Sequence, residues 1–182
     1  MKLYRAKIPA IAKETIALLV EDGDIEVEPE NREEAERDLE AIMEEYLRRD
    51  SSFRTSIKDD MARRNTPYGQ YGRTRSRMAE QMGHPLGDDV ERFLTRQFIE
   101  NMLISRFVEE VYSEDKDIHK KVIALLRTHT VDENEIREAA QSRIKNVKEG
   151  TVDWEIELQK AVREEKKRRG LLGPPRNPHH QK

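Results

Sequence analysis

The stretch NREEAERDLEAIMEEYL, residues 31–47, decides the fold class. Its apolar residues recur three or four positions apart, which places them on one face of an α-helix; they are Ala35, Leu39, Ile42, Met43, Tyr46 and Leu47. Asn31 and Glu34 have the spacing of a helix-capping residue and its partner three positions later. The stretch therefore predicts a helix that begins after Asn31 and buries one narrow stripe.

Stripes of the same kind lie on both sides of this helix. They predict further helices over residues 8–20, 53–61, 88–112, 118–126, 132–147 and 153–169, with a short helix over 73–82. Asp50, Ser51 and Ser52 resemble a break followed by a new cap, so we predict that one helix ends and another begins there. The expected fold is an all-α bundle of about seven to eight helices.

One short segment does not fit a helix. Residues 24–28, Asp-Ile-Glu-Val-Glu, alternate apolar and charged side chains, which is typical of a strand. A single strand needs a partner for its backbone groups, and Leu171-Leu172 is the segment that we expect to pair with it. The prediction allows at most this one extended piece, near Ile25-Val27.

Breaks in the helical pattern suggest the domain boundaries. Residues 65–72 and 83–87 contain proline and glycine, which disfavour helix. We therefore predict an N-terminal helical lobe over 1–64, a flexible linker containing Arg, Tyr and Gly over 65–87, a C-terminal helical lobe over 88–172 and a disordered tail over 173–182. The stretches 44–50 and 109–115 align at an offset of 65 residues. This alignment has two possible explanations: the two lobes are related by duplication, or two amphipathic helices match by chance.

Composition excludes several classes of chemistry. Charged residues make up 39% of the 182-residue chain and apolar residues 35%, and the net charge is −3. The absence of cysteine excludes disulfides, thiolate metal sites and a cysteine nucleophile. No apolar run approaches the roughly 18 residues of a membrane span, and no signal peptide is recognisable. We expect a cytoplasmic protein without a membrane partner.

The sequence contains no recognisable catalytic machinery. His84, His119 and His129 lack the helical spacing at which metal ligands converge, so no metal site is predicted. The loop Gly69-Gln70-Tyr71-Gly72 lacks the spacing and the lysine of a phosphate-binding loop. With 37 acidic residues, pairs of carboxylates carry no information. We predict no cofactor and no enzyme activity, although an enzyme of unidentified kind stays an open alternative.

The strongest local anomaly is an arginine-rich segment with two tyrosines. Between Arg63 and Arg77 there are five arginines and no acidic residue. Arginine contacts phosphates and tyrosine stacks on unpaired bases, so these residues form a candidate nucleic-acid site: Arg63, Arg64, Tyr68, Tyr71, Arg73, Arg75 and Arg77. Residues 21–50 carry 14 acidic and four basic side chains. A solvated linker whose arginines pair with that acidic region is the favoured alternative, and a docking loop for an acidic protein is the third.

Three quoted segments carry a resemblance to a known family. They are MKL at 1–3 leading into IPAIA at 8–12, LVEDGDIEV at 19–27 and REEKKRRGLL at 163–172. In these segments the chain resembles the bacterial "domain of unknown function 507" family. The resemblance implies a helical bacterial protein and supplies no catalytic residue to carry over.

The function expected from these features is binding rather than catalysis. Charged helix faces and the lack of catalytic motifs favour a non-catalytic interaction or scaffolding protein with a protein partner. A nucleic-acid or ribosome-associated protein that uses residues 63–77 is the alternative. Association of the chain with copies of itself, as a homo-oligomer, is a further open alternative.

Overall fold

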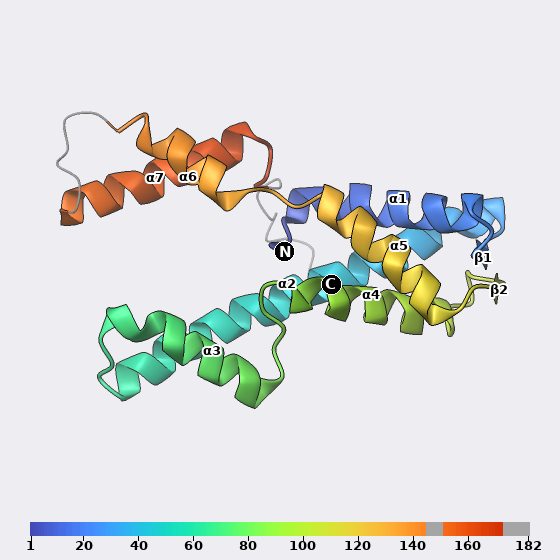
Figure 1. Cartoon of the computed structure of the whole chain (residues 1–182), viewed down its shortest axis with the longest axis horizontal. Coiled ribbons are helices and arrows are strands. Elements are labelled where there is room, and N and C mark those ends of the chain that lie inside the picture. Colours follow the sequence, from blue (N-terminus) through green and yellow to red (C-terminus); the bar gives the residue numbers. More distant parts are fainter. Residues whose placement is uncertain (145–150, 173–182) are drawn as a thin grey trace, which may run out of the picture. The chain divides into compact units, whose positions relative to one another are not determined.

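The computed structural model describes residues 1–144 and 151–172, and it confirms the all-α prediction. In chain order (Figure 1) the elements are η1 (Arg5–Lys7), α1 (Ile8–Glu21), β1 (Ile25–Glu26), η2 (Pro29–Asn31), α2 (Arg32–Arg63), η3 (Tyr68–Gln70), α3 (Tyr71–Met82), α4 (Asp89–Met102), β2 (Glu110–Val111), α5 (Asp115–Thr128), α6 (Glu133–Gln141) and α7 (Val152–Arg168). The only sheet among these residues is the pair β1 and β2.

The chain divides into two compact units. Unit 1 comprises Met1–Leu3 and Ile8–Thr130, and unit 2 comprises Tyr4–Lys7 and Val131–Lys182. The boundary between the units therefore lies elsewhere than the domain boundaries expected near residues 64 and 87, since both of these positions lie inside unit 1. The predicted disordered tail, 173–182, lies outside the described residues.

The main core of unit 1 lies among α1, the first half of α2, α4 and α5. Each helix contributes one apolar stripe, and removal of these stripes from water is the dominant favourable term for the bundle. Side chains with no exposed surface come from all four helices and include Ile11, Ile16, Leu19, Leu39, Met43, Leu94, Phe98, Ile118 and Leu126.

The predicted break at Asp50-Ser52 is wrong, because α2 continues without interruption to Arg63. Ser51 and Ser52 are exposed in the helix interior, where serine costs only about half a kcal/mol relative to alanine. The buried stripe continues past them through Phe53 and Ile57. Tertiary packing along that stripe outweighs the weak local preference of the serines for a cap.

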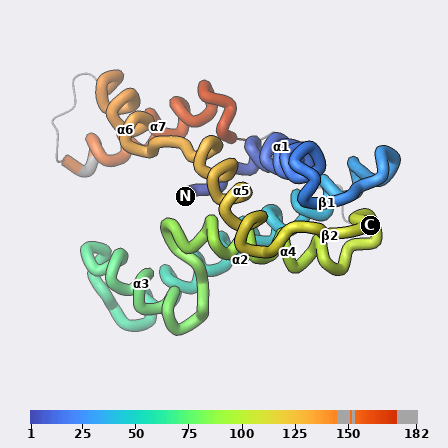
Figure 2. Tube along the Cα trace, turned by 45° about the vertical axis from the view of Figure 1, so that its right-hand side comes forward, coloured from blue at the N-terminus to red at the C-terminus, as the bar shows by residue number. Residues whose placement is uncertain are grey.

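The second half of α2 forms a helical hairpin with α3. Both views of the backbone show α3 alongside α2 (Figures 1 and 2), and the small core between them is made of Phe53, Ile57, Met61 and Ala79. The expected linker 65–87 therefore contains a packed helix. Its end is set by Gly83, whose φ of +58° is a left-handed conformation that terminates α3 and that other residues rarely adopt.

The helix predicted to reach Tyr112 ends at Met102; turns follow at 103–104 and 106–107, and the chain then forms the short strand β2. Strand β2 pairs antiparallel with β1, with Ile25 opposite Val111 and Glu26 opposite Glu110. The expected pairing of β1 with Leu171-Leu172 is therefore wrong. Residues 110–111 form a strand whereas 44–50 are helical, so the two aligned stretches do not form the same helix–break–helix unit.

Unit 2 is built on the antiparallel packing of α6 and α7. Trp154 and Leu158 of α7 are buried against Ala140 of α6. Tyr4 and Leu171 add a second apolar cluster around the other buried α6 residue, Ile136.

Candidate functional site

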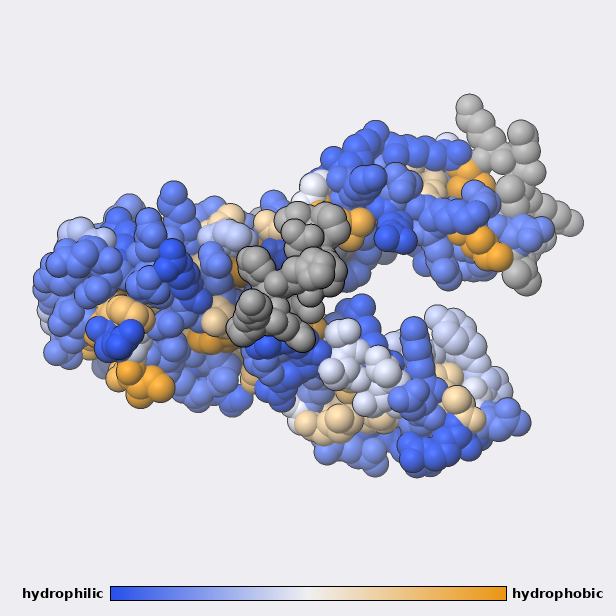
Figure 3. All heavy atoms as spheres, turned by 180° about the vertical axis from the view of Figure 1, so that it is seen from behind, coloured by the Kyte–Doolittle hydropathy of each residue, from blue (hydrophilic) through white to orange (hydrophobic). Residues whose placement is uncertain are grey.

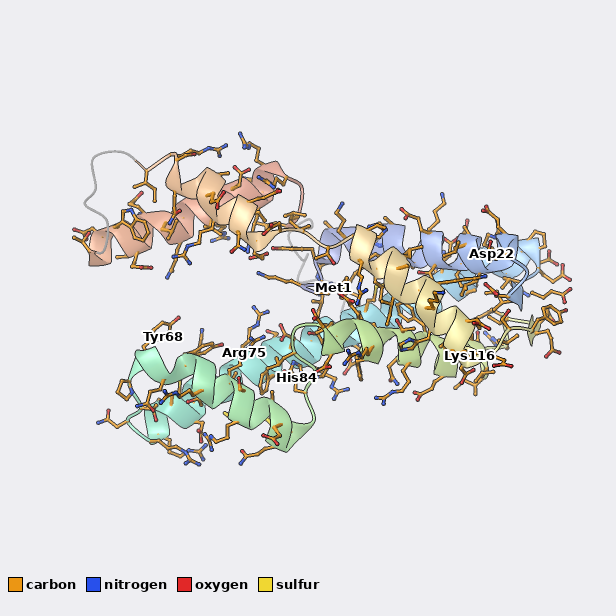
Figure 4. All side chains as sticks on the ribbon, viewed as in Figure 1. Met1, Asp22, Tyr68, Arg75, His84 and Lys116 are labelled. Atoms are coloured by element: carbon orange, nitrogen blue, oxygen red, sulfur yellow. The ribbon has the colours of Figure 1, made fainter. Side chains whose placement is uncertain are left out.

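The predicted arginine and tyrosine residues lie at the end of the α2–α3 hairpin. Arg63 and Arg64 end α2, Tyr68 lies in η3, and α3 carries Tyr71, Arg73, Arg75 and Arg77. Figure 4 shows Tyr68 near the turn between the two helices and Arg75 farther along α3. The fold thus brings all seven predicted residues onto one hairpin, but it gives them different surroundings.

Three of the five arginines converge on one carboxylate, Asp60. Arg64 Nε and Arg77 Nη2 each donate a hydrogen bond of 2.9 Å to it, and Arg63 Nη2 lies 3.5 Å away. The hydrogen bond from Arg64, with a smaller contribution from Arg77, holds the pKa of Asp60 below its usual range. These arginines therefore pair with Asp60 rather than with the acidic region 21–50 of the favoured interpretation.

The other two arginines lie outside this cluster. Among residues 1–144 and 151–172, neither Arg73 nor Arg75 has an ion-pair partner. Tyr68 is 82% exposed, and its ring stacks on Tyr71 with 5.7 Å between ring centroids. The hairpin end therefore combines unneutralised guanidinium groups with an exposed aromatic surface.

A second candidate site is a groove that the sequence patterns do not indicate. It lies in unit 1, has a volume of about 1090 Å³, and is bounded by α4, the end of α3 with the turn after it, and the start of α5. Hydrophilic residues cover most of the face of the molecule seen in Figure 3, with apolar residues gathered in separate patches. Against such a surface, a large groove with apolar walls is a distinctive feature.

The groove follows one stripe of α4. Lining residues recur along this helix at intervals of three or four and continue one residue past it; they are Asp89, Arg92, Phe93, Arg96, Ile99, Glu100 and Leu103. From Asp89 to Leu103 the stripe is about 21 Å long at 1.5 Å per residue. Leu103 is 58% exposed although it is apolar. Phe93 lines the groove and also packs against the core, so the periodic pattern of α4 does not separate a groove stripe from the buried stripe.

One wall of the groove contains a buried histidine. His84 follows Gly83 at the end of α3, and its Nε2 lies 3.3 Å from Oδ1 of Asp50 on α2. Its ring stacks on Phe53 with 4.3 Å between centroids. These contacts from two partners on α2 fix the turn after α3, which keeps that wall in place.

The described residues reveal neither a metal centre nor a membrane span. Within 1–144 and 151–172, no group of three or more His, Asp or Glu side chains converges as metal ligands would. No helix in those ranges is long and apolar enough to cross a bilayer.

Comparison with known proteins identifies the family. The chain shows no significant match to a curated protein. The family model described as "Protein of unknown function (DUF507)" matches residues 1–171, which is nearly the whole chain. The resemblance noted at the two ends of the sequence is thereby confirmed, and the chain belongs to the DUF507 family.

Proposed function

We propose that this protein is a non-catalytic interaction protein whose groove beside α4 binds an amphipathic helix of a partner protein. The observation that carries the proposal is the apolar lining of the groove, with Phe93 and Ile99 along α4 and the exposed Leu103 just past its end. An apolar groove bounded by helices is a common receptor for the apolar face of another helix.

The dimensions and charges of the groove favour a helix as the occupant. A length of about 21 Å accommodates roughly four helical turns. The rim carries both signs of charge, with Arg92, Arg96 and Lys116 interspersed among Glu80, Asp89, Glu100 and Asp115. Such a rim complements the mixed charges that flank the apolar stripe of a typical surface helix.

A matched pair of variants tests this proposal. Helical peptides selected from a display library for binding to the full chain should carry apolar residues at i, i+3 or i+4, and i+7. Leu103→Asp should weaken their binding at least about tenfold, because a carboxylate replaces apolar contact area. Ile104→Asp is the control, since Ile104 is 84% exposed and does not line the groove. Fluorescence anisotropy with labelled peptides measures both affinities.

Two results would count against the groove. One is a selection that yields no peptide with helical spacing. The other is equal weakening by the two aspartate variants, which would indicate a general effect of charge at the end of α4 rather than a contact in the groove. Self-association of the chain in sedimentation that is lost in Leu103→Asp and kept in Ile104→Asp would assign the groove to a second copy of the chain instead.

The second candidate function is binding of single-stranded nucleic acid at the end of the α2–α3 hairpin. Three guanidinium groups around Asp60, together with Arg73, leave a net positive charge beside the exposed ring of Tyr68. Guanidinium groups contact phosphates, and an exposed tyrosine ring stacks on unpaired bases.

This second candidate predicts a strongly salt-dependent affinity for single-stranded RNA. The double variant Tyr68→Ala with Arg73→Gln should bind at least about tenfold more weakly, since base stacking alone contributes about 1–3 kcal/mol. Arg137→Gln is the control because it removes an exposed arginine of α6, outside the hairpin. Anisotropy titrations across a salt series measure both effects. An affinity that does not change with salt concentration rules out this site. Equal weakening of binding by the double variant and by Arg137→Gln rules it out as well.

A further inference from the structure

Unit 1 contains a second, smaller cavity that is separate from most of the groove and is lined by two of the predicted nucleic-acid residues, Tyr71 and Arg75. Its volume is about 390 Å³, and Leu86 is the residue that it shares with the groove. Polar lining comes from α2 and α3, through Tyr46, Asp50, Arg54, Tyr71 and Arg75, and from Lys2. A cavity of this size fits a small molecule, since ligand pockets measure roughly 300–1000 Å³.

The two arginines of the cavity are in different electrostatic states. Arg54 Nη2 lies 2.5 Å from Oδ2 of Asp50, while the other oxygen of this carboxylate faces His84. The charge of Asp50 is therefore already matched within the protein. Arg75 has no carboxylate partner among residues 1–144 and 151–172, although its side chain is half-buried. A half-buried guanidinium without a counter-charge is a ready site for an external anion.

The hydroxyl group of a largely buried tyrosine accompanies these arginines. Tyr46 is only 7% exposed, and in the described part of the chain its hydroxyl has no hydrogen-bond partner. Burial, with a smaller effect of Asp50, raises the pKa of Tyr46 to about 12, while Arg54 and Arg75 act in the opposite direction. The hydroxyl therefore keeps its proton at neutral pH and remains available as a donor.

We propose that this cavity binds a small phosphate monoester, with Arg75 and the Tyr46 hydroxyl donating to the phosphate oxygens. A phosphate monoester brings a charge of nearly −2 and several strong acceptor oxygens, which suit a guanidinium fork and a hydroxyl donor together. Leu47 and Val90 line the same cavity and would contact the non-phosphate part of the molecule. Apart from Leu86, the groove and this cavity have different lining residues, so the proposal stands independently of the peptide-binding function.

Calorimetric titration of the full chain tests the proposal, with inorganic phosphate and glycerol 3-phosphate as probes at constant ionic strength. We expect saturable binding to one site, with glycerol 3-phosphate bound more tightly than inorganic phosphate because it also meets the apolar lining. Acetate is the comparison anion and should bind more weakly than both. Tighter binding of acetate would overturn the assignment to phosphate.

Two neighbouring arginines of α3 give a matched pair of variants. Arg75→Gln should weaken binding about tenfold or more, as expected for loss of a charge-assisted hydrogen bond. Arg73→Gln should leave the affinity within about twofold, since Arg73 is exposed and does not line the cavity. Tyr46→Phe keeps the ring and removes only the hydroxyl, so it should weaken binding several-fold.

Each remaining outcome is decisive. Absence of saturable binding to the wild-type chain overturns the proposal, and so does equal weakening by the Arg75 and Arg73 variants. If Arg75→Gln fails to fold by circular dichroism, Arg75→Lys replaces it. Lysine keeps the charge but lacks the planar fork, and it should still weaken binding measurably. Unchanged affinity in this variant would also contradict a role for the guanidinium.

Discussion

Replacing Phe98 by alanine is expected to lower the free energy of unfolding of unit 1 by about 3–5 kcal/mol. Phe98 has no exposed surface and lies in the core formed by α1, α2, α4 and α5. The substitution removes a large apolar side chain and leaves a cavity that its rigid neighbours fill only in part. Urea unfolding followed by far-ultraviolet circular dichroism measures the loss as a lower midpoint at unchanged slope.

Phe93 on the same helix is the matched control for that experiment. It lies five residues earlier, is half-buried, and lines the groove while it packs against the edge of the core. Phe93→Ala should cost about 1–2 kcal/mol, since only part of its surface is removed from water on folding. Equal costs for the two alanine variants would contradict the separation of a core stripe and a groove stripe on α4.

Acidification from pH 5 towards pH 2 is expected to destabilise unit 2 strongly through Glu165. This carboxylate has no exposed surface and forms ion pairs with Arg143 at 2.7 Å, Arg168 at 2.9 Å and Arg169 at 2.8 Å. Hydrogen bonds from Arg169 and then Arg168 lower its pKa from 4.5 to about 2. The folded state therefore holds the ionised form more firmly than the unfolded chain does.

The sign of the pH dependence follows from this lowered pKa. The stabilising contribution is complete above about pH 4.5, the unfolded value, and it decreases as the pH falls through that value towards about 2. Trp154, the single tryptophan, is buried in unit 2, so thermal melts followed by its fluorescence report this unit.

Two variants separate the effect of Glu165 from general acid denaturation. Glu165→Gln should lower the melting temperature at pH 7, because three guanidinium groups lose their shared carboxylate, and should flatten its pH dependence below 4.5. Glu164→Gln changes the exposed neighbouring carboxylate, so the melting temperature at pH 7 and its pH dependence should both stay close to those of the wild type. An unchanged pH profile in Glu165→Gln would show that this cluster does not govern the acid stability of unit 2.

The sequence predicted helix positions well wherever one apolar stripe dominated. The helices over 8–20 and 118–126 lie within α1 and α5 of the structure. The errors occurred where local signals compete with packing. Ser51 and Ser52 resemble a cap, yet the stripe that continues to Phe53 and Ile57 holds α2 together through them.

The opposite error occurred after α4. Residues such as Phe107 and Val108 continue the helical spacing of apolar residues beyond α4. The chain nevertheless leaves the helix, and its next residues pair as strand β2 with β1. That pairing joins segments about 85 residues apart in the chain, and no local pattern encodes such a contact.

The candidate sites differ in how far the sequence could predict them. The cluster of arginines and tyrosines was visible because its composition is unusual over 15 residues. The role of Asp60 could not be predicted, because nothing in the sequence shows that the fold places the Arg77 side chain against α2, where it shares Asp60 with Arg64. The groove and the smaller cavity arise from surfaces of separate helices, so only the folded structure brings their residues together.

The measurement that tests the central proposal most directly is an NMR titration of the full chain, labelled at its methyl groups, with a helical peptide selected on it. The proposal predicts that the methyl signals of Ile99 and Leu103 shift in proportion to peptide bound, while those of Ile136 and Leu158 in unit 2 do not. Saturable binding with the groove signals unchanged would contradict it, and would place the interaction surface elsewhere on the protein.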